Sequence, residues 1–543
     1  PESFAELIDS INVRGLLSSR YDIYTDVWPP THPEYPWYRT EGYPEDVVVD
    51  ADGSLHEGWL AYLRDGSPFQ GYYTCSSTHL KYAEQWIPPE LSTEHYNCRF
   101  IDVETASTLM ECYSPIHPAT RHDDAVNRTQ LLDKIKNDFH LVLGSEEARD
   151  FTFSDVDFGE GTMTITPAEN AGYDWATPTD SPGDYFINYN MNPAMRIPLH
   201  QLVFHDVHVA TWYTGDGVSK VPNFWDEKDL FNILYASMPL FMPPSLTYWQ
   251  QNREKFLTSY HLVSAIFRSA GFAKMTHHEM LSSDWKVQKT AFDNGWQVIA
   301  NFGDDDFSYN ETDIPPKGFY ATNGSEEVCK KIIQGKTVSC VRLKNRFFLN
   351  PYGEEIALDG VRTSGAIWLG KNEHSLDLAF IGDQNFVDIN PSLLPWDGVG
   401  SFQIFDKTDF RQIPTTDLSD GWVRIPKWNT DRFYVIQFLP TDVSKNGGAE
   451  IAEDYGLEIH PNPANSVVAI NFSLKKSSQL SVEIYNLLGQ RVLTLADGQF
   501  EGGHHQIFWN GKDSNANIVD SGIYFIYLKT PFYSKVKKIA LVK

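Results

Sequence analysis

The chain has 543 residues, enough for about three domains, and 41% of them are hydrophobic, so it can bury substantial cores. Its 72 acidic and 44 basic residues give a net charge of −28, which argues against a nucleic-acid partner because phosphate binding needs basic patches. No apolar run approaches the roughly 18 residues of a membrane-spanning helix. Aromatic residues make up 14% of the chain, and their rings either stack on sugars or simply fill cores.

The first 75 residues predict one helix, one strand and a long loop. Residues 1–12 are typical of the end of a helix, and residues 13–17 of a strand that leads into a polar segment at 18–27. Residues 28–75 are rich in Pro, Gly and aromatic residues and predict a loop at the rim of the fold. The chain starts with Pro-Glu-Ser-Phe, neither an initiator Met nor a signal peptide, so we expect a fragment that lacks an N-terminal part.

Strands and helices alternate further along. The pattern predicts, in order, a helix near 78–86, a strand ending at Asp102, a helix at 127–140, a strand ending at Glu146, a strand at 200–208, a buried apolar element at 230–242 and an amphipathic helix at 258–270. Such alternation indicates an α/β fold, a (β/α) barrel that is partial at its N-terminus, over residues 1–280.

The pattern changes to short strands and turns after about residue 280. Residues 285–292 alternate between polar and apolar side chains, 293–295 (DNG) form a hairpin turn, and 296–302 return as a strand. We expect one or two β-sandwich modules over 281–440 and a linker at 441–455. The five cysteines show no zinc spacing. Cys329 and Cys340 flank a hairpin-like segment and could pair in an oxidising compartment, or they are isolated buried thiols.

Residues 456–543 predict a separate immunoglobulin-like β-sandwich, because seven or so short strands follow one another. This part resembles FlgD-like immunoglobulin folds and the C-terminal sorting domains of type IX secretion, through PNPANS, IYNLLGQRV, GGHHQIFWNGKD, IVDSGIYFIYL and KVKKIALVK. The resemblance implies that secretion machinery is a partner. It also implies a protein that is secreted or lies on the cell surface of a Gram-negative bacterium of the Bacteroidetes type.

Two carboxyl groups, of Asp102 and Glu146, end two consecutive predicted strands. Residues at the C-terminal ends of barrel strands share one rim, where catalytic groups lie. Glycoside hydrolysis needs such a pair, about 5–5.5 Å apart in retaining enzymes and about 6.5–9.5 Å apart in inverting ones. Taken singly, each residue is better explained by a strand-end or helix-capping carboxylate, and only the pair with its surroundings favours a catalytic function. Glu147 competes with Glu146, because strand alternation lets only one of the two face the pocket.

The surroundings of this pair resemble the endo-α-N-acetylgalactosaminidase-like glycoside hydrolases, families 101 and 129. The similar segments are SSRYDIYTDV, RFIDVET, ECYSPIHPATR, LVLGSEEARDF and LVFHDVHVATWY, with KVQKTAFDNGWQVIANFGD similar to the sandwich that follows the barrel there, so the resemblance covers about 1–310. It implies that Asp102 is the nucleophile and Glu146 the general acid/base. It further implies hydrolysis of an α-linkage with retention, the substrate being a glycan that carries a sugar such as α-N-acetylgalactosamine.

Six other polar or aromatic residues near predicted strand ends are candidates for substrate binding: Arg20, Asp22, Tyr24, His205, Asp206 and Trp212. The alternative for each is a structural hydrogen bond or core packing. A cation such as Arg99 or Arg121 would favour the ionised form of a nucleophile, and an apolar wall would raise the pKa of an acid.

No cofactor or catalytic metal is expected. The acidic loops at 150–184 are compatible with a structural calcium ion, although they contain no EF-hand pattern.

Two other functions fit the same sequence. One is a non-catalytic carbohydrate-binding or adhesive surface protein on a degenerate barrel, which would not need both carboxyl groups. The other is a different carbohydrate-active enzyme, such as a polysaccharide lyase. The sequence leaves open the exact sugar, endo or exo action, the oligomeric state and the disulfide pairing.

Overall fold

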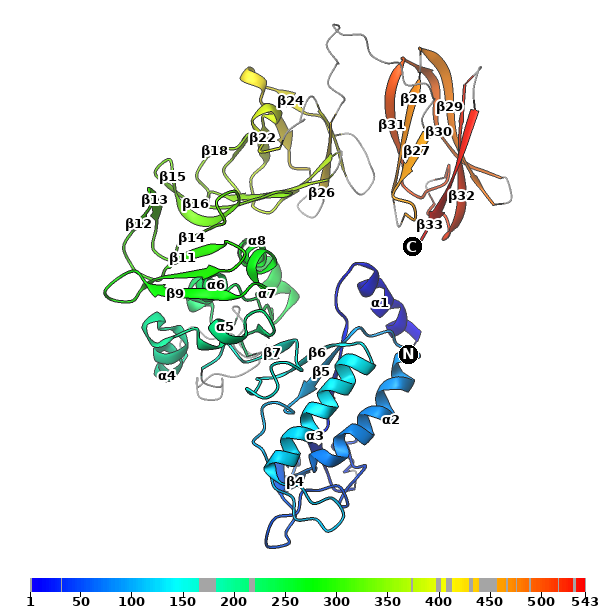
Figure 1. The fold of residues 1–543 in the computed structure, drawn as a ribbon. Helices are drawn as coiled ribbons and strands as arrows, with labels where there is room; N and C mark the ends of the chain where they lie inside the picture. Colours follow the sequence, from blue (N-terminus) through cyan, green and yellow to red (C-terminus); the bar gives the residue numbers. More distant parts are fainter. Residues whose placement is uncertain are drawn as a thin grey trace. The chain divides into compact units, whose positions relative to one another are not determined.

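The computed structural model describes residues 2–30, 32–165, 182–213, 220–372, 375–396, 402–406, 413–428, 433–438, 457–464, 467–474, 476–487, 490–515, 517–530 and 534–542 (Figure 1). It divides into two compact units, Pro1–Asn350 and Pro351–Lys543. The domain boundaries predicted at 280, 440 and 455 stay predictions, and the predicted linker at 441–455 lies outside the described residues. Among the described helices, none combines the length and the apolar character needed to cross a bilayer.

A five-stranded parallel sheet forms the N-terminal part of the first unit. Its strands, in spatial order, are β1 (Ser19–Ile23), β5 (Cys98–Asp102), β6 (Val142–Glu146), β7 (Phe158–Glu160) and β8 (Val209–Ala210). The spatial order follows the chain order and the strands pair in parallel. Helices lie in the connections from β1 to β5, from β5 to β6 and from β7 to β8, which confirms the predicted β/α alternation there, whereas residues 147–157 between β6 and β7 form turns. Within the described residues these five strands form an open sheet, and a closed barrel stays a prediction.

Two helices, α2 (His79–Leu91) and α3 (Arg121–Asp133), lie side by side against one face of this sheet (Figure 1). Buried apolar side chains from both layers make the core between them: Tyr24, Tyr82, Ala83, Ile87, Ile101, Leu131, Leu132, Ile135, Leu141, Leu143 and Val156. Helix α3 starts six residues before the predicted one because Thr120 and Asp123 form a capping box. A π-helical turn, η2 (Lys134–Asp138), follows it.

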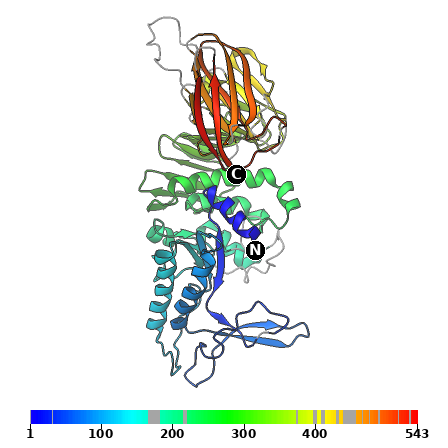
Figure 2. The same ribbon diagram turned by 90° about the vertical axis from the view of Figure 1, so that its right-hand side faces the viewer.

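Two predictions near the N-terminus are wrong. Residues 13–17 are not a strand, because helix α1 (Glu2–Val13) runs to Val13 and Gly15, with φ of +72°, ends the helix in the left-handed conformation. The predicted loop at 28–75 contains two strands, β3 (Glu57–Tyr62) and β4 (Pro68–Tyr73). With β2 (Asp26–Val27) they form a three-stranded antiparallel sheet in the order β2-β4-β3 (Figure 2).

The strand predicted at 200–208 is also wrong. Residues 199–204 form the short helix α5 (Leu199–Phe204), and only Val209 and Ala210 belong to a strand. The remaining helices of this part are α4 (Asp184–Phe186), α6 (Trp225–Leu234), α7 (Leu246–Gln251) and α8 (Arg253–Ala270). Helix α6 covers only residues 230–234 of the buried apolar element predicted at 230–242, and α8 contains the predicted amphipathic helix at 258–270.

An antiparallel sheet completes the first unit. Its order is β9 (Met275–Met280), β10 (Val287–Phe292), β11 (Gln297–Asn301), β14 (Phe319–Thr322), β15 (Glu327–Ile333), β16 (Lys336–Leu343) and β17 (Arg346–Asn350), and the hairpin of β12 (Phe307–Tyr309) and β13 (Thr312–Ile314) stands beside it. The predicted turn at 293–295 joins β10 to β11, with Gly295 at φ +91°. Cys329 and Cys340 face each other across β15 and β16 as free thiols, with 2.9 Å between their Sγ atoms.

The second unit is all β. One sheet has the order β18 (Ile356–Leu358), β19 (Val361–Thr363), β22 (Phe386–Ile389), β25 (Val423–Pro426) and β24 (Thr416–Asp417). Another set pairs as β20 (Ile367–Lys371), β21 (Ser375–Phe380), β26 (Phe433–Phe438) and β23 (Phe402–Asp406). The described chain is therefore multidomain and rich in β-structure, as predicted.

The C-terminal residues form the predicted seven-stranded sandwich. One sheet contains β27 (Leu457–His460), β28 (Val468–Leu474) and β31 (Gly503–Trp509). The other has the order β30 (Arg491–Phe500), β29 (Ser478–Asn486), β32 (Gly522–Lys529) and β33 (Ser534–Leu541). Residues in β28 alternate between buried and half-buried, and Trp509 is fully buried in the core that the two sheets share.

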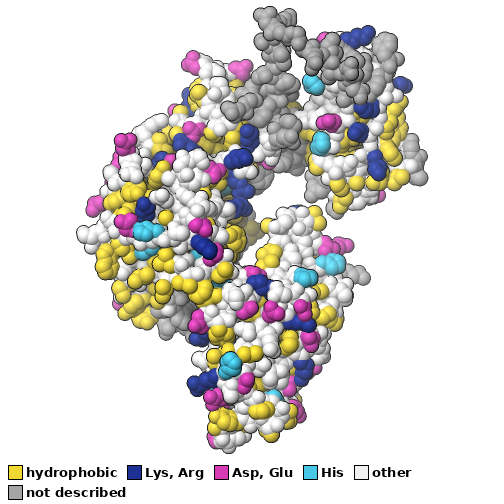
Figure 3. Space-filling model, viewed as in Figure 1, with side chains coloured by type: hydrophobic (Ala, Val, Ile, Leu, Met, Phe, Trp, Pro, Cys, Tyr) yellow, Lys and Arg dark blue, Asp and Glu magenta, His cyan; other side chains and the backbone are white. Residues whose placement is uncertain are grey.

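Charged side chains of both signs are spread among hydrophobic ones on the face of the molecule seen in Figure 3.

Candidate active site

Asp102 and Glu146 end the adjacent parallel strands β5 and β6. Ile101 lies opposite Ser145 in the register, so the next residue of each strand carries a carboxyl group at the same edge of the sheet. The Ser145 hydroxyl donates a 2.5 Å hydrogen bond to the carbonyl oxygen of Ile101, which holds the two strand ends together. The structure thus brings together the two carboxyl groups that the sequence pairs, and their catalytic roles stay a prediction.

Both carboxyl groups belong to the face of the sheet that α2 and α3 do not cover. Ile101 and Leu143, which precede them with the opposite side-chain direction, are buried in the core against the helices. On the carboxyl face, Phe100 stacks on Tyr21 of β1, with ring centroids 6.1 Å apart. The rings of Phe100 and Tyr21 therefore form an apolar surface beside the two acids.

The residue after Asp102 has an unusual backbone. Val103 has φ of +61°, a region that a β-branched residue rarely adopts. Its backbone N–H interacts with the carboxyl groups of both Asp102 and Glu146 and lowers the pKa of each. One donor shared by two acids means that the acids lie close together. Backbone strain of this kind gathers at functional sites, where the surrounding structure enforces it.

The two acids have different environments. Burial, followed by repulsion from the charge of Asp102, raises the pKa of Glu146 to about 7, although the Tyr213 hydroxyl donates to Glu146 Oε1 at 3.1 Å. Burial also raises the pKa of Asp102, and the Tyr21 hydroxyl opposes that rise by donating a 2.5 Å hydrogen bond to Asp102 Oδ2. Near neutral pH, Glu146 is therefore the group that holds a proton.

A third acid and three tyrosines, which the sequence-based prediction missed, lie around this pair. Burial raises the pKa of Asp26 to about 6, and the charge of Asp102 adds to the rise. The charges of Asp26 and Glu146 also raise the pKa of Tyr73, after burial. The tyrosines are Tyr21, Tyr73 and Tyr213. The register of β1 against β5 could have identified Tyr21. Tyr21 and Ile23 share one face of β1, and Ile23 lies opposite Asp102.

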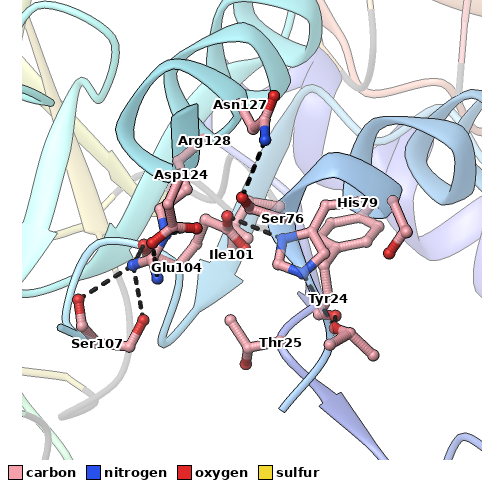
Figure 4. A network of polar contacts seen from close by, with 12 residues as sticks. Tyr24, Thr25, Ser76, His79, Ile101, Glu104, Ser107, Asp124, Asn127 and Arg128 are labelled. Atoms are coloured by element: carbon pink, nitrogen blue, oxygen red, sulfur yellow. Dashed lines mark hydrogen bonds and ion pairs between the residues drawn. The ribbon is translucent and has the colours of Figure 1, made fainter. Parts of the chain in front are cut away.

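A network of buried polar side chains lies next to the loop that follows β5 (Figure 4). The Glu104 and His79 side chains are almost completely buried, and His79 Nδ1 lies 3.0 Å from Glu104 Oε1. The other ring nitrogen of His79 lies 3.0 Å from the Thr74 hydroxyl, which donates to the carbonyl oxygen of Tyr24. Burial acts to raise the pKa of Glu104, but the charge of His79, its hydrogen bond and the charge of Arg128 together hold that pKa below its usual value.

Arg128 of α3 fixes the loop that follows Asp102 (Figure 4). Its guanidinium donates to the carbonyl oxygens of Glu104 and Ser107, each at 3.0 Å. It also forms a buried ion pair with Asp124, 2.9 Å long. Because the loop starting at Val103 is anchored to both helices, the position of Asp102 is set by the core of the fold.

Three of the predicted substrate-binding residues lie on the other side of β1. Arg20 forms a 2.6 Å ion pair with Glu90 of α2, and Asp22 accepts a 2.6 Å hydrogen bond from Arg99. Tyr24 is fully buried and donates to Asp22 at 3.1 Å. Asp22 and Tyr24 share parity, as expected, and these side chains face the helix layer and not the face that carries Asp102, so a role in substrate binding stays a prediction.

Arg99 and Arg121, the two cations expected near the nucleophile, form ion pairs with other residues. Arg99 pairs with Asp22 and Glu90 on the helix side of the sheet, and Arg121 lies 4.0 Å from Glu111. The structure instead provides Tyr21 and the Val103 N–H as groups that favour the ionised form of Asp102.

The other three predicted binding residues also have contacts within the fold, and their role in binding stays a prediction. The ring nitrogens of His205 lie 2.6 Å and 2.7 Å from the carbonyl oxygens of Ala273 and Tyr235. Trp212 is fully buried and its Nε1 donates to Asn232 at 2.9 Å. Asp206 lies 3.7 Å from Lys274. These residues were expected at the end of a strand, but residues 199–204 form a helix; His205 and Trp212 are buried, whereas Asp206 is partly exposed.

Glu147 and the acidic segment at 150–184 were also candidates from the sequence. Glu147 follows the end of β6 with φ of +53°, and its N–H donates to the carbonyl oxygen of Glu160. Glu146, not Glu147, therefore holds the strand-end position beside Asp102. Part of the acidic segment at 150–184, residues 166–181, lies outside the described residues, and a calcium ion there stays a prediction.

Two family matches agree with the resemblances found in the sequence. Residues 4–291 match the family described as glycosyl hydrolases related to the GH101 family, GH129. Residues 458–542 match the secretion system C-terminal sorting domain. This domain marks type IX secreted proteins of Bacteroidetes, so the predicted localisation is confirmed.

Two solved structures are similar to parts of the chain. The ligand-free α-N-acetylgalactosaminidase NagBb from Bifidobacterium bifidum is 21% identical, with a TM-score of 0.41 over 55% of this chain and 42% of that enzyme. The chain therefore spans less than half of the length of that enzyme. FlgD from P. aeruginosa is 22% identical, with a TM-score of 0.13 over 17% of this chain and 74% of that protein. A comparison with curated proteins finds no match.

Proposed function

The chain belongs to the GH101-related family of glycosyl hydrolases, GH129, and from this premise we propose that it is a secreted glycoside hydrolase that cleaves α-linked glycosides with retention. The observation that carries the proposal is the pair of carboxyl groups at the ends of β5 and β6, in unequal environments. We also propose that the five parallel strands belong to a (β/α) barrel, since neighbouring barrel strands deliver such a pair to one rim.

Asp102 acts as the nucleophile and attacks the anomeric carbon to form a glycosyl-enzyme ester. Its hydrogen bonds from Tyr21 and from the Val103 N–H support this role, because a nucleophile has to be ionised. Glu146 protonates the leaving oxygen in the first step and removes a proton from water in the second. A pKa of about 7 suits the acid role at neutral pH.

The same pair explains how Glu146 changes from acid to base. The charge of Asp102 is the second largest cause of the raised pKa of Glu146. Ester formation at Asp102 removes that charge, so the pKa of Glu146 falls in the intermediate. The carboxylate that results is the base that the hydrolysis of the ester requires. The two acids end neighbouring parallel strands at the same edge of the sheet, which supports the proposed pairing.

The sugar follows from the family. The family model and the segments around both acids support α-N-acetylgalactosamine as the glycone of a glycan substrate. The C-terminal sandwich supports a second partner, the type IX secretion machinery, which would use this domain as an address.

The test is hydrolysis of a panel of aryl α- and β-glycosides by the full-length protein, by Asp102→Asn and Glu146→Gln, and by Glu147→Gln as a matched control. We expect cleavage of the α-N-acetylgalactosaminide by the parent protein and by the control, and its loss in Asp102→Asn. A product that absorbs in the ultraviolet would indicate a lyase. Sugar binding without any cleavage, unchanged in Asp102→Asn, would indicate a carbohydrate-binding protein. Full activity of both active-site variants would contradict the assignment of the pair.

A further inference from the structure

Two cysteines and a histidine converge beside the loop that follows β5. Cys75 lies between β4 and α2, and Cys112 and His117 lie in the loop between β5 and α3. Both cysteines are buried, and one ligand atom from each of the three residues lies within 4.8 Å of the other two. Cys112 Sγ is 3.4 Å from His117 Nδ1. These are the atom types that Zn²⁺ prefers in proteins.

The histidine is already in the form that binds a metal. Its Nε2 lies 2.7 Å from the carbonyl oxygen of Glu45. A carbonyl oxygen only accepts hydrogen bonds, so Nε2 carries the proton and the lone pair of Nδ1 points toward Cys112 Sγ. Metal-bound histidines have this arrangement, in which the second ring nitrogen donates to a carbonyl or carboxylate and fixes the tautomer.

The spacing of the ligand atoms is close to that around a tetrahedral zinc ion. Bonds of about 2.3 Å to sulfur and about 2.05 Å to nitrogen place the S and N atoms about 3.6 Å apart and two S atoms about 3.8 Å apart. The distance from Cys112 Sγ to His117 Nδ1 is 3.4 Å, and the remaining pairs lie within 4.8 Å. A shift of an ångström or less, within reach of side-chain rotation, completes the geometry.

A backbone donor also prepares the sulfur for the thiolate form. The N–H of Val49 points at Cys112 Sγ at 3.5 Å. Hydrogen bonds from N–H groups stabilise a negative charge on the acceptor. Cys112 is held in place through its own backbone, which pairs with Ala119 in both directions at 2.7 Å and 3.0 Å.

We propose that Cys75, Cys112 and His117 bind one Zn²⁺ ion, with a water molecule as the fourth ligand on the side where His117 is half-buried. The ion joins three segments of the fold. It ties the loop that begins at Asp102 to the start of α2 and, through Glu45 and Val49, to the segment before β3. It thereby helps to fix the loop that follows Asp102, which Arg128 also holds. The proposal does not depend on the glycosidase activity.

The first test is metal analysis of the full-length protein, purified with a reductant that is not a thiol and without chelators. We expect one equivalent of zinc per chain, and its loss from Cys75→Ser and from Cys112→Ser. Cys340→Ser is the matched control, since it also removes one cysteine of a close buried pair, and it should retain the zinc. Zinc that survives in Cys75→Ser and Cys112→Ser but leaves Cys340→Ser would overturn the assignment.

A second measurement needs no variant and covers the case in which the variants fail to fold. Replacement of zinc by Co²⁺ in the parent protein should give the visible bands of a tetrahedral site and a thiolate-to-cobalt charge-transfer band. Chelation should lower the Tm. The absence of these bands, or a Cys75–Cys112 disulfide detected by peptide mass spectrometry in the native exported protein, would contradict the proposal.

Discussion

The substitution Tyr21→Phe removes a side-chain hydrogen bond that favours the ionised form of Asp102. Hydrogen bonds to charged groups contribute about 1.5–3 kcal/mol, and the lower end applies here because Tyr21 is 57% exposed. About 1.5 kcal/mol corresponds to roughly one pKa unit. The pKa of Asp102 therefore rises by about one unit in the variant. The acidic limb of the kcat/KM profile should move to higher pH by the same amount, while the basic limb, set by Glu146 near pH 7, stays in place.

The assay is kcat/KM against pH with an aryl α-glycoside. Tyr485→Phe is the matched control, because it removes a similar tyrosine–carboxylate hydrogen bond, 2.9 Å long, to Glu483 in the C-terminal sandwich. Its pH profile should equal that of the parent protein. An acidic limb that does not move in Tyr21→Phe would refute the claim that Asp102 must be ionised and that Tyr21 keeps it so.

Three further predictions concern the acid, the buried network and the sorting domain. Glu146→Gln should lose the basic limb near pH 7, and kcat for substrates with poor leaving groups should fall by about 10²–10⁴; equal loss for all leaving groups would argue against an acid role. Glu104→Gln removes the buried carboxylate that pairs with His79 and lies near the charge of Arg128, and should lower the unfolding free energy by about 3–5 kcal/mol, measured with urea. Since the folded pKa of Glu104 is lowered, that difference should be present above its unfolded pKa and vanish as the pH falls through the folded pKa. Trp509→Ala should destabilise the C-terminal sandwich by about 3–5 kcal/mol and abolish export in cell fractionation, while the catalytic activity of lysates persists.

The positions of the two acids could be predicted because each ends a short apolar strand. In a parallel sheet such ends meet at one edge, whatever the details of the connections. The sequence of the C-terminal sandwich was equally informative, since its strands alternate and its turns have specific signals. Side-chain pairing could not be predicted in the same way. Asp22 faces the helices because Arg99, on the neighbouring strand, forms an ion pair with it, and no local pattern reveals a partner so distant in the chain.

Other errors have local causes. The apolar residues at 200–208 suit a short helix as well as a strand, and periodicity does not separate the two over so few residues. In the predicted loop at 28–75, Asp65 and Gly66 already mark the turn between β3 and β4, and Gly66 has φ of +83°. The proposed zinc ligands could not be recognised from the sequence, because Cys75 comes from one loop and Cys112 from another. The spacing rules for metal-binding motifs therefore do not apply.

The most direct test of the central claim is to trap the glycosyl-enzyme with a fluorinated α-glycoside that forms the ester quickly and releases it slowly. Peptide mass spectrometry then locates the sugar. Retention with Asp102 as nucleophile predicts one label, on the peptide that contains Asp102, and no label in Asp102→Asn. A label on Glu146 or on any other acid, or turnover without a trapped ester and with inversion at the anomeric carbon, would contradict the account.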